Sequence, residues 1–155
     1  MPETSHSPRR IADDHVAQVA ALDPATATRL GLGPEDDRLP DLSPEGHAAL
    51  AELSRRTLAV LDAAEKAAGK EPGAQEPADR DCARLLRERL TAELAVHDAG
   101  DDLLQLRNVN SPLHRVRGVF TLMPTDTDEH WAAVAGRLRN LPGTLDGYRA
   151  TLTEG

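Results

Sequence analysis

The chain has 155 residues, which suits a single domain with a modest hydrophobic core. Aromatic residues make up only 2% of it, so the core must be built from leucine, alanine and valine, and its stability margin should be thin. The net charge of -8 is spread along the chain without a basic patch, which argues against nucleic acids and anionic membranes as partners.

The sequence carries no signal for export or membrane insertion. It has no apolar run of about 18 residues, so we expect no transmembrane helix. The polar residues 1–10 lack the apolar centre of a signal peptide and are expected to form a disordered tail ahead of a helical domain at 11–155. The single cysteine, Cys82, excludes an internal disulfide. We therefore expect a cytoplasmic protein.

The first third of the chain predicts two helices. Over 11–22, one side carries Ile11, His15, Val16 and Val19 at helical spacing. Asp23 then caps a short helix that starts at Pro24, runs towards Leu30 and is closed by Gly31 and Gly33. No segment of the chain alternates apolar and polar residues as a half-buried strand does.

Two long helices are predicted in the middle of the chain. A hydroxyl cap at Ser43 and a proline at Pro44 start the first, which should run to about Ala68. Its inward residues are Leu50, Leu53, Thr57, Leu61, Ala64 and Ala68. An exposed linker at 69–77 precedes a second helix over about 78–97. Its inward residues are Ala83, Leu86, Leu90, Leu94 and His97.

The last third predicts three helices separated by prolines. Residues 103–110 fit either a short helix or an extended segment. Pro112 starts a helix that Pro124 ends, with Leu113, Val116, Phe120 and Met123 inward. Thr125 and Asp126 cap the next, with Trp131, Val134, Leu138 and Leu141 inward, and Pro142 starts the last, with Leu145, Tyr148 and Leu152 inward. We therefore predict an all-α, up-and-down antiparallel array of about five main helices plus one or two short ones.

The aromatic residues all fall in this last third. Helical spacing places Phe120, Trp131 and Tyr148 on the inward sides of their helices, so we expect one cluster that joins the last three helices. Truncation of a buried tryptophan typically costs about 3–5 kcal/mol, which is the cost expected for Trp131→Ala.

The titratable residues do not form a recognisable metal or catalytic motif. No two of the six histidines lie three or four residues apart, as a zinc helix requires. Asp126 and Asp128 fit the first turn of a helix better than a calcium loop. Cys82 lies near the inward face of its helix with no base in reach, as a buried inert thiol does. We expect no metal, no cofactor and no catalytic residue in this chain.

One polar group stands out as a candidate ligand or cavity contact. Asn108, Asn110 and Ser111 precede a predicted helix start, where amide and hydroxyl side chains can bind a ligand. The same side chains also commonly satisfy local turns and helix caps, and both interpretations remain open.

Several ordered patterns resemble one bacterial family, called domain of unknown function 885. They are Asn-x-Asn-Ser-Pro-Leu at 108–113, Val-Phe-x-Leu-Met-Pro-Thr-Asp-Thr-x-Glu-x-Trp at 119–131 and Arg-Leu-x-x-Leu-Pro-x-x-Leu-x-x-Tyr at 137–148. The stretches at 22–31 and 36–46 resemble the early part of the same family. The resemblance covers nearly the whole chain beyond the first ten residues.

The resemblance implies a mostly helical fold and a link to zinc peptidases. Longer relatives carry a motif of the form H-E-x-x-P-G-H downstream of the matched region, and this chain does not contain that motif. Our leading hypothesis is therefore a non-catalytic N-terminal helical fragment that resembles the cavity wall of a zinc-peptidase-like hydrolase. The alternative is a free-standing helical module that binds itself or a protein partner through exposed apolar helix faces. An enzyme acting alone is a third, weaker hypothesis, because no acid, base and nucleophile converge.

Overall fold

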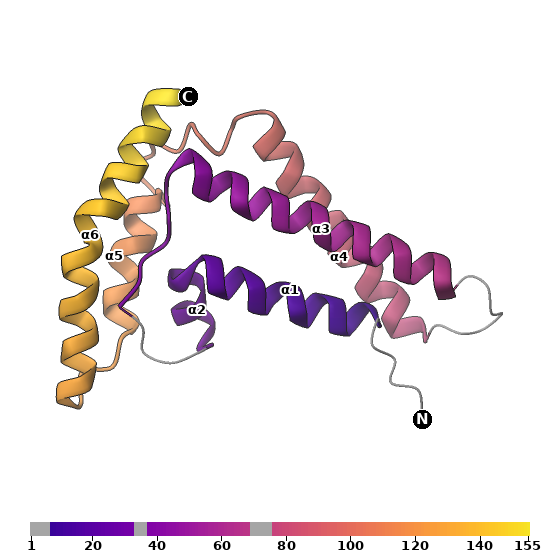
Figure 1. The fold of residues 1–155 in the computed structure, drawn as a ribbon, viewed down its shortest axis with the longest axis horizontal. Helices are drawn as coiled ribbons and strands as arrows, with labels where there is room; N and C mark the ends of the chain where they lie inside the picture. Colours follow the sequence, from indigo (N-terminus) through magenta and orange to yellow (C-terminus); the bar gives the residue numbers. More distant parts are fainter. Residues whose placement is uncertain (1–6, 33–36, 69–75) are drawn as a thin grey trace.

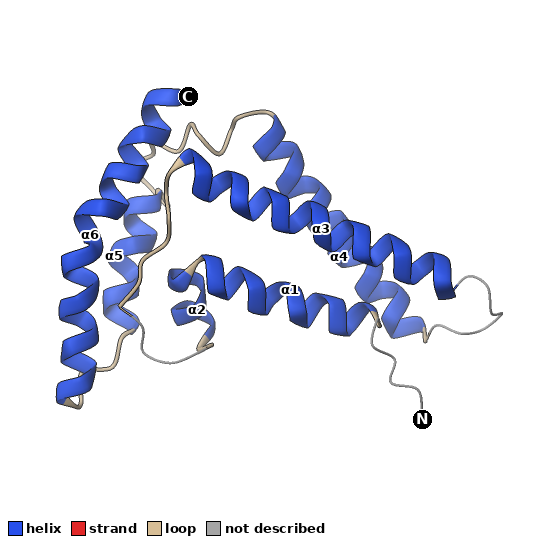
Figure 2. Ribbon diagram, viewed as in Figure 1, coloured by secondary structure: helices blue, strands red, loops and turns tan. Residues whose placement is uncertain are grey.

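The computed structural model describes residues 7–32, 37–68 and 76–155, and these residues form helices and loops without a strand (Figure 2). The helices are α1 (Pro8–Leu22), α2 (Pro24–Leu30), α3 (Pro44–Ala68), α4 (Pro77–Asp98), α5 (Pro112–Leu122) and α6 (Asp128–Glu154). The predicted all-α array is therefore confirmed. None of the described helices combines the length and the apolar character that crossing a bilayer requires.

The helices form two groups that meet at one end. α1, α3 and α4 pack side by side, with α3 antiparallel to both neighbours (Figure 1). α5 and α6 run antiparallel to each other and lie across the end of this group (Figure 1). The short α2 packs against both α1 and α5 there. The chain is thus an up-and-down three-helix group with a helix pair set across it.

A proline occupies the first turn of most helices, which explains why their starts could be predicted. Asp23 caps α2 by accepting from the backbone N–H groups of Ala25 and Thr26, and Gly31 ends it with a φ of 67°. The Ser43 hydroxyl accepts from the N–H of Gly46 at the start of α3. α1 begins earlier than predicted, because Ser7 caps it and Pro8 is its first residue. The predicted tail over 1–10 is therefore too long, and residues 1–6 lie outside the described part.

Of the two predicted connections, the structure describes one in full and the other only at its end. Most of the linker predicted at 69–77 lies outside the described residues, and Pro77 already belongs to α4. The ambiguous segment 103–110 contains no helix and continues from the turn after α4 as irregular chain. The Tyr148 hydroxyl donates to the carbonyl of Gln105 at 2.8 Å, so the segment is held against α6.

The two helices predicted after Pro124 are one. α6 runs from Asp128 to Glu154 with Pro142 in its interior, and Thr127 rather than Thr125 or Asp126 caps it. Pro142 removes one intrahelical hydrogen bond, but it lies on the exposed side, where water can satisfy the freed carbonyl. The buried side of α6 continues past it without a break, so packing outweighs the cost of the proline.

That buried side packs against an extended segment at 37–43. Asn140 donates to the carbonyl of Asp37 at 2.9 Å, Thr144 to that of Pro40 at 3.4 Å and Thr151 to that of Leu42 at 2.6 Å. The approach is close enough that a Cβ added at Gly136 would lie 2.5 Å from the Cβ of Asp37. Polar side chains of α6 therefore donate hydrogen bonds to the backbone carbonyls of a segment that has no strand partner.

The aromatic cluster is only partly as predicted. Phe120 and Tyr148 pack in one cluster with Leu42 and Val116. Trp131 is 57% exposed, so its predicted inward position is wrong, and the large stability cost assigned to Trp131→Ala does not apply. Three other residues predicted to be inward are also exposed: Leu113, Leu138 and Leu145. For Trp131, Leu138 and Leu145 the error arises because the side of α6 that faces segment 37–43 is mostly polar or small, which leaves much of the apolar stripe facing solvent.

The hydroxyl of Thr151 should contribute measurably to stability. Thr151→Val keeps the shape but leaves the buried carbonyl of Leu42 without this donor, which typically costs about 1–3 kcal/mol. Thr153→Val is the matched control, because its exposed hydroxyl donates only within its own helix, and it should change stability by less than about 0.5 kcal/mol. Urea unfolding of both variants measures the difference. Equal effects would show that segment 37–43 is not held by this bond.

Candidate functional site

A cavity of about 370 Å³ lies where the two helix groups meet. Its volume falls in the range of small-molecule sites. The end of α1, the segment 40–42, the first turns of α3, the chain at 102–110 and the start of α5 all contribute to its wall. The lining comprises Leu22, Asp23, Pro40, Asp41, Leu42, Gly46, His47, Leu50, Asp102, Gln105, Asn110, Pro112 and Arg115. Apolar and polar groups therefore line the same cavity.

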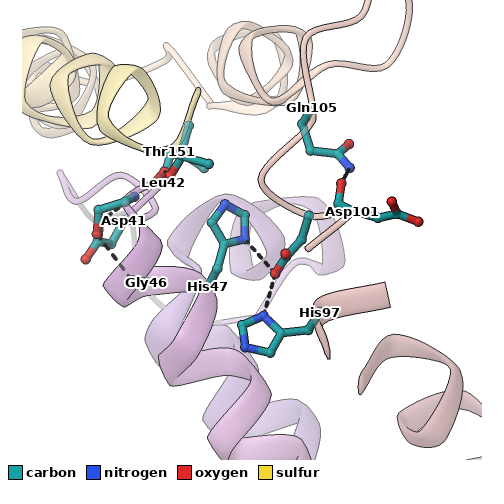
Figure 3. Close-up of polar contacts among 10 residues, drawn as sticks. Asp41, Leu42, Gly46, His47, His97, Asp101, Gln105 and Thr151 are labelled. Carbon is teal, nitrogen blue, oxygen red and sulfur yellow. Dashed lines mark hydrogen bonds and ion pairs between the residues drawn. The ribbon is translucent and has the colours of Figure 1, made fainter. Parts of the chain in front are cut away.

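Two histidines from different helices face one carboxylate beside this cavity. His97, in the last turn of α4, places Nδ1 2.6 Å from Oδ2 of Asp102. His47, in the first turns of α3, places Nδ1 3.7 Å from the same oxygen (Figure 3). The side chains of His47 and Asp102 are largely buried. The carboxylate thus links the end of α4 to the start of α3.

The environment of the His47 ring disfavours its protonated form. Burial lowers the pKa of His47 below its ordinary value, and the charges of Arg115 and His97 act in the same direction. Asp102 and Asp41 oppose the shift in this pKa but do not overcome it. At 3.7 Å, Nδ1 of His47 and Oδ2 of Asp102 are too far apart for a hydrogen bond, and they attract each other only while the ring is protonated.

Two buried polar atoms in this cluster have no hydrogen-bond partner among the described residues. They are Nε2 of His47 and Oδ1 of Asp102. Buried polar atoms in native proteins are almost always paired, and these two atoms have almost no accessible surface, so they do not themselves face the cavity. Both residues line the cavity, which makes it the candidate binding site of this chain.

The structure places the three candidate residues predicted from the sequence, Asn108, Asn110 and Ser111, in different surroundings. Asn110 lines the cavity and has a φ of 56°, a conformation that asparagine tolerates. Asn108 is exposed and is not part of the lining. Ser111 is buried at the start of α5, and its hydroxyl contacts Nδ1 of His114 at 2.8 Å. Of the three, Asn110 alone lies at the candidate site.

The central residues of the site were not predicted. His47 and Asp102 lie 55 positions apart, and no motif spacing connects them. One local signal exists in the sequence. His47 follows the helix start at Ser43-Pro44, and Asp102 follows the helix end at Gly100, and functional residues often lie close to such helix ends. Within the described ranges, no three histidine, cysteine or acidic side chains are arranged to hold a metal ion.

The comparisons with known proteins place these observations in a family. The family model described as bacterial protein of unknown function (DUF885) matches residues 24–155. This range includes every residue that lines the cavity except Leu22 and Asp23. No curated protein matches the chain.

The buried histidines should make stability depend on pH. The pKa of His47 is depressed in the folded state by burial, as is that of His15, so the unfolded chain binds protons first as the pH falls below about 6.5. The contribution of these two histidines to the free energy of unfolding is therefore fully present above that pH and is lost below it. His47→Gln should reduce the decline between pH 7.5 and 5.5 measured by urea unfolding, while the exposed control His114→Gln should not. An unchanged slope in His47→Gln would contradict the assignment.

Proposed function

The chain belongs to the bacterial family of unknown function DUF885, and on that premise we propose that it is a non-catalytic helical unit that walls a ligand cavity. The observation that supports this best is the convergence of five separate segments on one cavity of about 370 Å³. A wall built from many segments holds its polar groups at fixed positions, which is what ligand binding requires.

The chemistry of the lining supports binding rather than turnover. Asp102, His47 and Arg115 can hold charged or hydrogen-bonding groups of a ligand. The described lining includes no serine, cysteine or lysine that His47 could activate as a nucleophile. As in the zinc-peptidase-like hydrolases that the sequence resembles, any bond cleavage would depend on groups outside this set.

Binding and catalysis can be tested separately on the purified chain. Peptide and ester substrates, with and without added zinc, should not be hydrolysed above the buffer rate. A mixture of small polar fragments should shift the backbone amide resonances of Gly46 and Asn110, which line the cavity. Leu50→Trp fills the cavity and should abolish these shifts, whereas Leu58→Trp, outside the lining, should not. Hydrolysis by the purified chain would contradict the non-catalytic assignment. If no fragment shifts a cavity resonance, the proposed binding function of the cavity is wrong.

A second candidate function is supported by the exposed side of α6. Trp131, Leu138 and Leu145 follow one another at intervals of seven residues and are 57%, 53% and 39% exposed. Apolar side chains at this spacing form a continuous stripe along a helix, as in helix-pairing surfaces. This candidate is a helical interaction module that binds a protein partner, or a second copy of the chain, through α6.

The stripe predicts self-association that a single charge should disrupt. If α6 is a pairing surface, sedimentation of the wild-type chain should show concentration-dependent dimers, because exposed apolar stripes favour association. Trp131→Glu should shift the chain to monomer, since pairing would bury an uncompensated charge. Ala132→Glu, which is exposed beside the stripe, is the control and should preserve association. A wild-type monomer at all concentrations would exclude self-pairing through this surface.

A further inference from the structure

The polar cluster where the turn after α4 meets the start of α3 is incompletely hydrogen-bonded. Neither ring nitrogen of His47 makes a hydrogen bond to the described residues, because Nε2 is buried without a partner and Nδ1 lies 3.7 Å from Oδ2 of Asp102. Oδ1 of Asp102 is also buried without a partner in the described part of the chain. His97 supplies one bond, from Nδ1 to Oδ2 of Asp102 at 2.6 Å (Figure 3). Exposure to water would therefore give this cluster hydrogen bonds that it lacks in the folded structure.

A single turn of the chain, at 99–103, carries Asp102 to this junction with α3. The turn is held to itself and to the end of α4 by backbone hydrogen bonds, in which the N–H groups of Gly100, Asp101, Leu103 and Leu104 donate to the carbonyls of His97, Val96, Gly100 and Asp101, respectively. Its polar contact with α3 is the 3.7 Å pair of Asp102 and His47, which is not a hydrogen bond. Because the helices are held by continuous backbone hydrogen bonds, the junction should open at a lower free energy than the helices do.

Proton uptake by His47 favours opening of this junction. Burial lowers the pKa of His47 in the closed state, the charges of Arg115 on α5 and His97 on α4 act in the same direction, and Asp102 on the turn and Asp41 on segment 37–43 oppose them. A ring that reaches water regains an ordinary pKa of about 6.5, so the open state binds the proton first as the pH falls. His97 can donate from Nδ1 in either protonation state, so its bond to Asp102 does not reverse this effect.

We propose that His47 and the turn at 99–103 form a proton-sensitive latch, in which protonation of His47 releases the turn from the start of α3 while the helices stay folded. Asp102, Gln105 and Asn110 line the cavity, so release of the turn would open one of its walls. Control of ligand binding by this latch rests on the proposed cavity function, whereas the latch itself requires no ligand.

Amide hydrogen exchange of the full chain at pH 7.5 and pH 5.5 tests the latch. Protection factors at the amides of Leu103 and Leu104, corrected for the intrinsic effect of pH on exchange, should fall by about tenfold. This is the change expected when a group with a pKa of about 6.5 takes up a proton in the open state alone. The amides of Arg80 and Trp131 lie in the first turns of α4 and α6, far from the junction, and their protection should change by less than about twofold (Figure 1).

Matched variants identify the histidine that takes up the proton. His47→Gln has no titratable ring and should abolish the fall in protection at Leu103 and Leu104. His15→Gln removes a buried histidine of the three-helix group, whose Nδ1 lies 2.9 Å from the hydroxyl of Thr57, and should leave the fall intact. The two variants make the same chemical change, so their difference reports position alone.

Each outcome bears on the latch or on the cavity. Protection at Leu103 and Leu104 that is independent of pH in the wild-type chain overturns the latch, whether or not His47→Gln folds. An equal fall at Arg80 and Trp131 would show global unfolding instead of a local release, and a fall that survives in His47→Gln would assign the proton to another group. If the latch is confirmed but no fragment shifts a cavity resonance at pH 7.5, the latch stands and the cavity function fails. If fragments bind and protection is independent of pH, the cavity function stands without the latch.

Discussion

The packing of segment 37–43 against α6, with Pro40 and Leu42 buried, is the constraint on which the rest of this structure depends. Residues 37–43 lie in neither a helix nor a sheet, so their backbone groups cannot be paired by regular structure. α6 supplies the donors through the side chains of Asn140, Thr144 and Thr151. Thr144 and Thr151 are buried, and because an unpaired buried carbonyl costs more than a hydrogen bond gains, these two positions must carry polar side chains although they face the interior.

The same segment determines where the cavity lies. Pro40, Asp41 and Leu42 form one wall of it, and Asp41 also bonds the backbone N–H of Ser43 at the start of α3. A side chain at Gly46 would collide with the carbonyl of Asp41, so the segment and the first turn of α3 are in direct contact. This contact holds His47 at a fixed position opposite the loop that carries Asp102. The polar pairing of an irregular segment thus leads directly to the geometry of the candidate site.

Local signals in the sequence predicted the helices well and the interior of the last helix poorly. Caps and first-turn prolines act within four residues, so the starts of α2, α3 and α5 followed from the sequence alone. Which side of α6 is buried depends on segment 37–43, about a hundred positions away, and hydrophobic spacing selected the wrong side for Trp131 and Leu138. The helix start predicted at Pro142 is wrong for the same reason, because long-range packing outweighs the local penalty of a proline inside a helix.

The candidate site lies beyond sequence reasoning for a related reason: its value depends on pairing that no single segment contains. His47 and Asp102 would each pass as an ordinary surface residue in its own segment, yet the fold buries both and leaves one atom of each without a partner among the described residues. A fold stabilised mainly by small side chains has little free energy to spare for such atoms. Any molecule that binds the cavity in the folded state alone would add to the stability of the fold.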